Sequence, residues 1–285
     1  MKPMSLSEQI TYSTVLIQCK YKDDTIGIGI GFIINLCKNE KEQTYIPALI
    51  TNSHVVENST QTVFEFCKSD DHKNPIDTES LCITYNANKW IHHPDKEVDL
   101  QCLPIGPILD EIKKENKKAF YIALNTNIIP NNEILNDLMG IEDVIMVGYP
   151  KGLSDTYNHK PVIRKGITAT HPRNNYQGKK ETLLDISCYP GSSGSPVFIL
   201  NEGAYSTKTG VTIGAPRIYL LGILYKGPLF DAQGVLTFSE LPNIPTPTVS
   251  IPMNLGVMIK AERILEFEKL LSQEANYGKD ENGNI

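Results

Sequence analysis

The sequence predicts an all-β fold that ends in an α-helix. Short segments rich in β-branched and aromatic residues recur along the chain, and turns rich in Asn, Asp, Lys and Gly separate them. From residue 260 to 271 the apolar side chains instead recur at helical spacing. With 285 residues, of which 40% are hydrophobic, the chain is long enough for one large β domain with a substantial core.

The predicted strands form two groups, each with the spacing of a β-barrel. The first group lies at residues 11–20, 26–36, 45–51, 61–67, 80–85 and 98–104. The second lies at residues 143–150, 160–170, 181–188, 196–201, 217–225 and 250–259, with a Gly/Thr/Ser-rich loop expected at 202–216. Residues 108–114 and 132–138, between the groups, have helical spacing. We therefore expect one domain over 1–285, made of an N-terminal barrel (11–105), a connection (106–141), a C-terminal barrel (142–259), a helix (260–273) and a flexible tail (274–285).

A serine between glycines stands out in the second group, where residues 191–196 read GSSGSP before an apolar strand. The small flanking residues leave a hydroxyl accessible to a substrate carbonyl. The backbone N–H groups of Gly191 and Ser193 can point to where an oxyanion forms, and one such donor contributes about 3 kcal/mol to transition-state stabilisation. The pattern favours acyl transfer over a plain Gly/Ser hairpin turn.

A nucleophilic serine needs a base and a group that orients this base. Among six histidines, His54 alone follows a long apolar run, at residues 45–50, and lies in the segment TNSHVV. Asp99 is the one acid of an alternating apolar strand, where a carboxylate needs a partner. Asp95, in a turn beside a proline, is the alternative orienting group. The chain order His, Asp, Ser differs from that of α/β-hydrolases and subtilisins.

These segments resemble the trypsin-like, chymotrypsin-fold serine proteases, in the form of stand-alone bacterial trypsin-like peptidase domains. LITNSHVV at 49–56, the strand that begins at Asp99 and GSSGSPVF at 191–198 match the family's motifs, and the resemblance spans roughly residues 11–272. It implies two six-stranded antiparallel β-barrels with a C-terminal α-helix. It also implies a triad of His54, Asp99 and Ser193, with the amides of Gly191 and Ser193 as the oxyanion hole.

The resemblance implies a serine endopeptidase that acts on a protein or peptide substrate and has a possible regulatory protein partner. Ser187, six residues before the nucleophile, would form the floor of the S1 pocket, and Tyr225, Lys226 and Gly227 its wall and the backbone-binding edge. A serine floor has no negative charge, so we expect a neutral P1 residue, with Lys226 able to favour acidic or polar groups. The alternatives are a catalytically silent binding or scaffold module and a non-peptide acyl hydrolase.

Charge and composition argue against several other classes. The net charge of −6 and the absence of an arginine cluster exclude general nucleic-acid binding. The N-terminus has no apolar signal-peptide core, and no apolar run is long enough for a membrane span. The six scattered cysteines then predict free thiols in a cytoplasmic enzyme. Secreted trypsins carry an activating aspartate just before the nucleophile, but here Ser192 stands there, so we expect no zymogen ion pair.

Two other motifs predict structure rather than ligand binding. His92 and His93 lie beside Asp95, but no further ligand follows at zinc-like spacing, so we expect a solvated turn and no metal. Residues 26–32 read IGIGIGF and continue as a strand, so this segment is not a nucleotide-binding loop. Its glycines predict a curved strand in a small barrel. No cofactor is expected.

Overall fold

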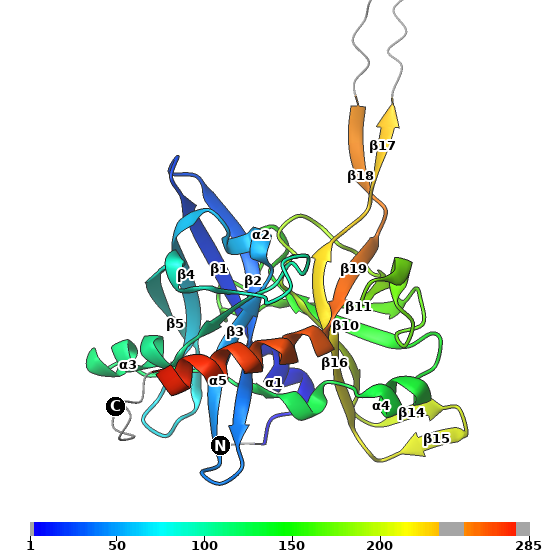
Figure 1. Ribbon diagram of the computed structural model, residues 1–285, viewed down its shortest axis with the longest axis horizontal. Coiled ribbons are helices and arrows are strands. Elements are labelled where there is room, and N and C mark those ends of the chain that lie inside the picture. The colour runs from blue at the N-terminus through cyan, green and yellow to red at the C-terminus, as the bar shows by residue number, and fades with distance from the viewer. Residues whose placement is uncertain (1–2, 234–247, 278–285) are drawn as a thin grey trace, which may run out of the picture.

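The computed structural model describes residues 3–233 and 248–277 (Figure 1). The fold is mostly β, with one closed six-stranded antiparallel barrel, an open sheet and a C-terminal helix. The two predicted groups of strands correspond to the two halves of the molecule. The predicted tail lies outside the described residues from 278 onward.

The N-terminal half is one sheet with the strand order β5-β4-β1-β2-β3-β7-β6. Its strands are β1 (Thr14–Tyr21), β2 (Ile26–Asn39), β3 (Thr44–Thr51), β4 (Ser59–Ser69), β5 (Pro75–Asn86), β6 (Ile91–His92) and β7 (Gln101–Pro104). Among the described strands no ladder joins β5 to β6, so the expectation of a second closed barrel is corrected to an open sheet. The 3₁₀ turn η1 (Ala87–Lys89) separates β5 from β6, and β6 has only two residues with which to pair.

The C-terminal half is the closed barrel, in the order β10-β11-β12-β19-β16-β13. Its strands are β10 (Asp143–Gly148), β11 (Val162–Thr168), β12 (Glu181–Asp185), β13 (Pro196–Asn201), β16 (Arg217–Lys226) and β19 (Leu255–Lys260). Two hairpins leave it. β14 (Ala204–Thr207) and β15 (Gly210–Ile213) occupy the stretch expected to be a loop, and β17 (Leu229–Gln233) with β18 (Thr248–Pro252) project as an arm in Figure 1.

One helix precedes the first strand, and two more lie in the connection between the halves. α1 (Leu6–Ser13) precedes β1 because Ser5 and Glu8 form a reciprocal capping box, so the first strand starts three residues later than expected. In the connection, α3 (Gly106–Lys114) and α4 (Asn132–Asp137) lie where helical spacing predicts them. Between them β8 (Ala119–Phe120) and β9 (Leu124–Asn125) add to β4 and β2, with a 3₁₀ turn η2 (Thr126–Ile128) after β9. α2 (Ser53–Val56) follows β3.

The C-terminal segment packs between the halves. Instead of one helix from residue 260, a 3₁₀ segment η5 (Ala261–Glu266) leads into α5 (Phe267–Tyr277), which crosses the front of the molecule in Figure 1. Phe267 and Leu271 belong to a buried cluster that also contains Phe32 of the sheet and Phe198 of the barrel. A fully buried apolar side chain contributes about 1.5–3 kcal/mol, so this shared core holds the halves together.

The structure also bears on the expectations about membrane spans and cysteines. None of the helices in residues 3–233 and 248–277 is long and apolar enough to cross a membrane. The six cysteines all lie in the described residues, and no disulfide joins any two of them there.

Candidate active site

His54 and Asp99 meet through two hydrogen bonds. His54 lies in α2, immediately after the apolar strand β3. Its backbone N–H donates to Oδ1 of Asp99 over 3.0 Å, and its ring Nδ1 lies 2.5 Å from Oδ2. Asn52 donates to the Asp99 carbonyl over 2.9 Å. The carboxylate side chain is 24% exposed and the imidazole 47%, so a sheltered acid orients a base that remains open to solvent.

The serine turn has the backbone that the glycines predict. Gly191 and Gly194 have φ angles of +83° and +87°, a region that favours glycine. Ser192 donates its N–H to the Tyr189 carbonyl over 3.0 Å. Within residues 3–233 and 248–277 the N–H groups of Gly191 and Ser193 have no protein acceptor. Both donors are therefore available to a bound oxyanion.

One residue of the N-terminal half, Ile30, holds this turn. Ile30 of β2 donates its N–H to the Ser193 carbonyl over 3.0 Å. Thr51, three residues before His54, donates to the Ile30 carbonyl over 2.6 Å. A Cβ on Gly194 would lie 1.7 Å from that same carbonyl oxygen, so only glycine fits. The segments that carry the base and the serine thus meet at Ile30.

The Ser193 hydroxyl contacts a backbone carbonyl of β16. It donates to the carbonyl of Tyr225 over 3.4 Å. No hydrogen bond between Ser193 and His54 occurs in the described part of the chain. An O–H···O bond is typically 2.5–3.0 Å long, so the contact with Tyr225 is weak and does not lock the side chain. The structure brings His54 and Asp99 together and docks the serine turn, while the Ser193 hydroxyl makes its hydrogen bond with Tyr225.

The residues predicted for substrate binding lie on two segments. Ser187 is exposed, and its carbonyl accepts a hydrogen bond from Nη1 of Arg164 over 2.5 Å. Lys226 is exposed, with Nζ 4.6 Å from the centroid of the Tyr225 ring. Burial, and then hydrogen bonding to Glu181, raises the pKa of the Tyr225 hydroxyl. Sequence reasoning missed Arg164 and Glu181, because only the barrel's strand order places them beside these segments.

Gly227 lies close to a cysteine that sequence reasoning did not assign to the site. A Cβ on Gly227 would lie 3.2 Å from the Cβ of Cys188, and a Cβ on Gly256 would lie 2.6 Å from its Sγ. Burial raises the pKa of the Cys188 thiol to about 11, although the nearby charge of Arg164 lowers it. The neutral thiol therefore fills the space between these two glycines.

The alternative orienting group and the histidine pair have structural roles. Asp95 pairs with Arg263, Oδ2 to Nη2 over 2.5 Å, rather than with His54. His93 is 3% exposed, so the expectation of a solvated turn is wrong for this residue. Its Nδ1 accepts the Asp95 N–H over 3.1 Å, and its Nε2 lies 3.0 Å from the Arg263 carbonyl, which makes the Nε2 proton the donor. The described residues contain no group of three side chains that could hold a metal ion.

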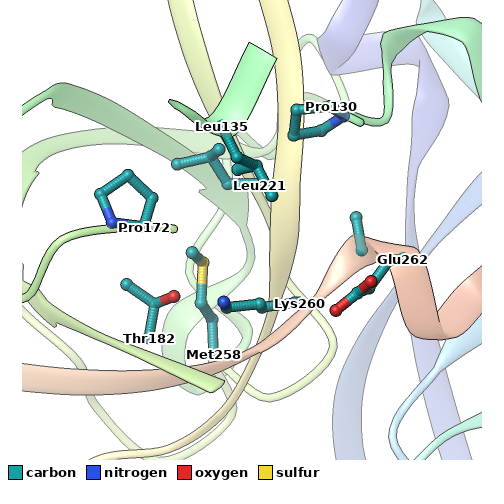
Figure 2. A pocket seen from close by; sticks show the side chains of 9 residues that line it. Pro130, Leu135, Pro172, Thr182, Leu221, Met258, Lys260 and Glu262 are labelled. Atoms are coloured by element: carbon teal, nitrogen blue, oxygen red, sulfur yellow. The ribbon is translucent and has the colours of Figure 1, made fainter. Parts of the chain in front are cut away.

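Two hollows differ greatly in size, and the larger is lined by residues of both halves. One, of about 450 Å³, borders Asp99 and is lined by Lys179, Glu181, Tyr225 and Lys226, so it is continuous with the candidate site. The other measures about 10 Å³, room for about one water molecule. Leu221, Met258 and Lys260 converge on it in Figure 2. Burial lowers the pKa of Lys260, whose Nζ donates to Asn175 over 2.9 Å.

Similarity to known proteins is shown at the level of a domain family. Two solved structures, an HtrA-type protease AlgW with tripeptide and a serine-to-alanine variant of it, each share 14% sequence identity with the chain, with TM-scores of 0.47 and 0.49. Each match covers 94% of this chain, which spans 62% of the length of either structure. No curated protein matches. The model of the trypsin-like peptidase domain matches residues 29–204, more than half of the chain. The chain therefore belongs to the trypsin-like peptidase domain family.

Proposed function

We propose that the protein is a serine endopeptidase with a triad of His54, Asp99 and Ser193. The observation that carries the proposal is the pair of hydrogen bonds by which Asp99 holds both the backbone and the ring of His54. With Nδ1 bound to the carboxylate, Nε2 is the ring atom free to exchange a proton. Family membership supports a protein or peptide substrate.

The reaction follows from these positions. Ser193 Oγ attacks the scissile carbonyl carbon while its proton passes to Nε2 of His54, and the π electrons move onto the carbonyl oxygen. When the carbonyl reforms, the C–N bond breaks and His54 gives the proton to the leaving amine. Water then attacks the acyl group in the same way, with His54 again as base, and releases the acid and Ser193. Asp99 stays ionised and stabilises the imidazolium at each step.

The oxyanion is assigned to the amides of Gly191 and Ser193. Their lack of a protein acceptor in the described residues supports this role, because each donor keeps its hydrogen bond for the transition state. The weak contact between Ser193 and the Tyr225 carbonyl would be given up when substrate binds. The edge at Tyr225–Gly227 then pairs with the substrate backbone as an antiparallel strand.

A neutral P1 residue fits the surroundings of Ser187. The guanidinium of Arg164 binds the Ser187 carbonyl, so a positive charge lies beside the proposed floor. Lysine or arginine at P1 would be repelled by this charge, and Lys226 adds a second one nearby. A positional peptide library tests the assignment, since dominant cleavage after Arg or Lys would contradict it.

The function itself is tested with a fluorophosphonate probe, which reacts with activated serines. The wild-type protein should be labelled on Ser193, and Ser193→Ala should lose both labelling and peptide hydrolysis. Ser192→Ala is the matched control, because the Ser192 hydroxyl is buried and has no hydrogen-bond partner, so its loss should leave labelling intact.

The other outcomes identify the alternatives. Labelling of a different serine in Ser193→Ala would overturn the triad. A wild-type protein that is never labelled would indicate a silent binding module, which the orientation of the Ser193 hydroxyl toward Tyr225 also fits. Faster turnover of esters than of peptides, measured side by side, would favour a non-peptide acyl hydrolase.

A further inference from the structure

The oxyanion turn rests on a loop that follows β10. The N–H of Lys151 donates to the Pro190 carbonyl over 3.1 Å, directly before Gly191. A Cβ on Gly191 would lie 3.0 Å from the same Lys151 nitrogen, so the two backbones are in direct contact. The position of the Gly191 amide therefore depends on where this loop lies.

The loop, residues 149–160, is closely bonded within itself. Gly152 and Leu153 donate to the carbonyls of Tyr149 and Pro150, each over 2.8 Å. Asp155 and Lys160 exchange two backbone hydrogen bonds of 3.0 and 3.2 Å. The Asp155 carboxylate also accepts hydrogen bonds from the Asn158 side-chain amide and from the N–H groups of Asn158 and Tyr157, and these lower its pKa. Two internally bonded turns, at 149–153 and 155–160, thus connect Lys160 to Lys151 along the chain.

The far end of the loop is bound to the N-terminal half by charged groups. Lys160 Nζ lies 2.8 Å from Oδ1 of Asp77 on β5 and 3.5 Å above the centroid of the Tyr12 ring. The Tyr12 hydroxyl donates to the same Asp77 oxygen over 2.7 Å. His159 Nδ1 lies 2.8 Å from Oε1 of Glu65 on β4. The Lys160 side chain is 21% exposed, which makes its ion pair better shielded than a typical surface pair.

The near end of the loop also contacts the N-terminal half. Tyr149 is 6% exposed and packs with Leu16 and Ile30. Gly152, with a φ of +74°, lies under Ile28, whose Cδ1 would be 3.1 Å from an added Cβ. The loop therefore lies between the N-terminal half and the oxyanion turn, bound to both.

We propose that the 149–160 loop positions the oxyanion hole, and that Lys160 and His159 are the positioning residues that anchor it. The inference rests on the proposed function, since it needs the Gly191 amide to bind an oxyanion. It also explains how the turn is held in place although Ser192 occupies the position of the activating aspartate of secreted trypsins. Small displacements of such a donor slow the chemical step more than they weaken substrate binding.

The test compares two lysine variants by the kinetics of fluorophosphonate labelling. The concentration dependence of the rate separates the binding constant of the probe from its rate of reaction with Ser193. Lys160→Met should lower the reaction rate about tenfold and leave the binding constant within about twofold. The matched control is Lys165→Met, which removes an exposed ion pair with Asp143 on the barrel surface and should change neither value.

Rescue and hydrogen exchange separate positioning from general destabilisation. Lys160→Arg keeps the charge and should retain most of the rate. Asp77→Asn removes the same ion pair from the side of the sheet, with no change in the loop sequence, and should also slow the reaction. Amide exchange in the 190–194 segment should become faster in Lys160→Met and not in Lys165→Met. If Lys160→Met fails to fold, Asp77→Asn and the exchange measurement decide alone.

The outcomes distinguish this inference from the proposed function. Labelling of wild type on Ser193, with equal rates in Lys160→Met, Asp77→Asn and Lys165→Met, would contradict the positioning role and leave the function standing. A wild-type protein that is not labelled would contradict both the proposed function and the positioning role. A slower reaction with unchanged probe binding, restored in Lys160→Arg, supports the proposal.

Discussion

One carboxylate, that of Asp99, binds both the backbone and the ring of His54, over 3.0 Å at the N–H and 2.5 Å at Nδ1. The backbone bond fixes where α2 begins, and the ring bond fixes how the imidazole is turned. A single side chain thus determines both the position and the orientation of the proposed base.

Asp99→Asn should inactivate the protein without unfolding it. The asparagine carbonyl can still accept the His54 N–H, but its NH₂ group then faces Nδ1 and favours the tautomer with the proton on Nε2. That tautomer cannot accept the serine proton, so kcat should fall about 10⁴-fold. Steady-state kinetics and thermal unfolding check this prediction. A variant with the wild-type kcat would show that Asp99 is not part of the triad.

Gly194→Ala should be far more damaging than Gly178→Ala. Both glycines have φ angles near +80°, but an added Cβ meets the Ile30 carbonyl oxygen at Gly194 and nothing within 4 Å at Gly178. Gly178→Ala should cost about 1–2 kcal/mol of unfolding free energy for the left-handed backbone alone. Gly194→Ala should cost more than about 4 kcal/mol. Denaturant unfolding of both variants measures the difference, and equal losses would argue against the contact with Ile30.

Asp95→Asn should destabilise the protein at neutral pH and not in acid. The N–H of Glu97, and then Arg263, lower the pKa of the Asp95 carboxyl from 3.8. A lowered folded-state pKa contributes stability above the unfolded value, and this contribution disappears as the pH falls through the folded value. Melting temperatures of wild type and variant should therefore converge below about pH 3.8. Asp71→Asn, at an exposed carboxylate, is the control, and a gap that persists in acid would contradict the assignment.

Cys188 should react with iodoacetamide more slowly than the exposed Cys82. With a pKa of about 11, about one thiol in a thousand is ionised at pH 8, and the side chain is only 6% exposed. Cys82, which is exposed, should react first. Peptide mapping by mass spectrometry over time gives the order. Early alkylation of Cys188 would show that the space beside Gly227 opens in solution.

Local patterns were sufficient for the elements and residues that depend on neighbours in sequence. The helical spacing at α3 and α4 and the glycines around Ser193 determine structure over a few residues, and the family match extends over most of these motifs. Every residue of β14 and β15 is exposed or half-buried, and among the described strands the two pair only with each other, so their sequences carry no apolar pattern. A composition rich in Gly, Thr and Ser then predicted a loop.

Contacts between distant segments could not be predicted. The burial of His93 depends on the Arg263 carbonyl, 170 residues further along the chain. Likewise, the anchoring of Lys160 by Asp77 requires the two halves to be docked. The open edge of the N-terminal sheet depends on the turn η1, whose three residues resemble any polar connection. Each of these features follows from tertiary placement, which residue spacing does not encode.

The backbone of Ile30 has a consequence for splitting the chain into fragments. Because its N–H binds Ser193 and its carbonyl receives both Thr51 and the close approach of Gly194, the serine turn of one half is completed by a strand of the other. Fragments cut in the connection should each be inert and regain probe reactivity only when mixed. Such a split pair would serve as a sensor for whatever brings its two pieces together.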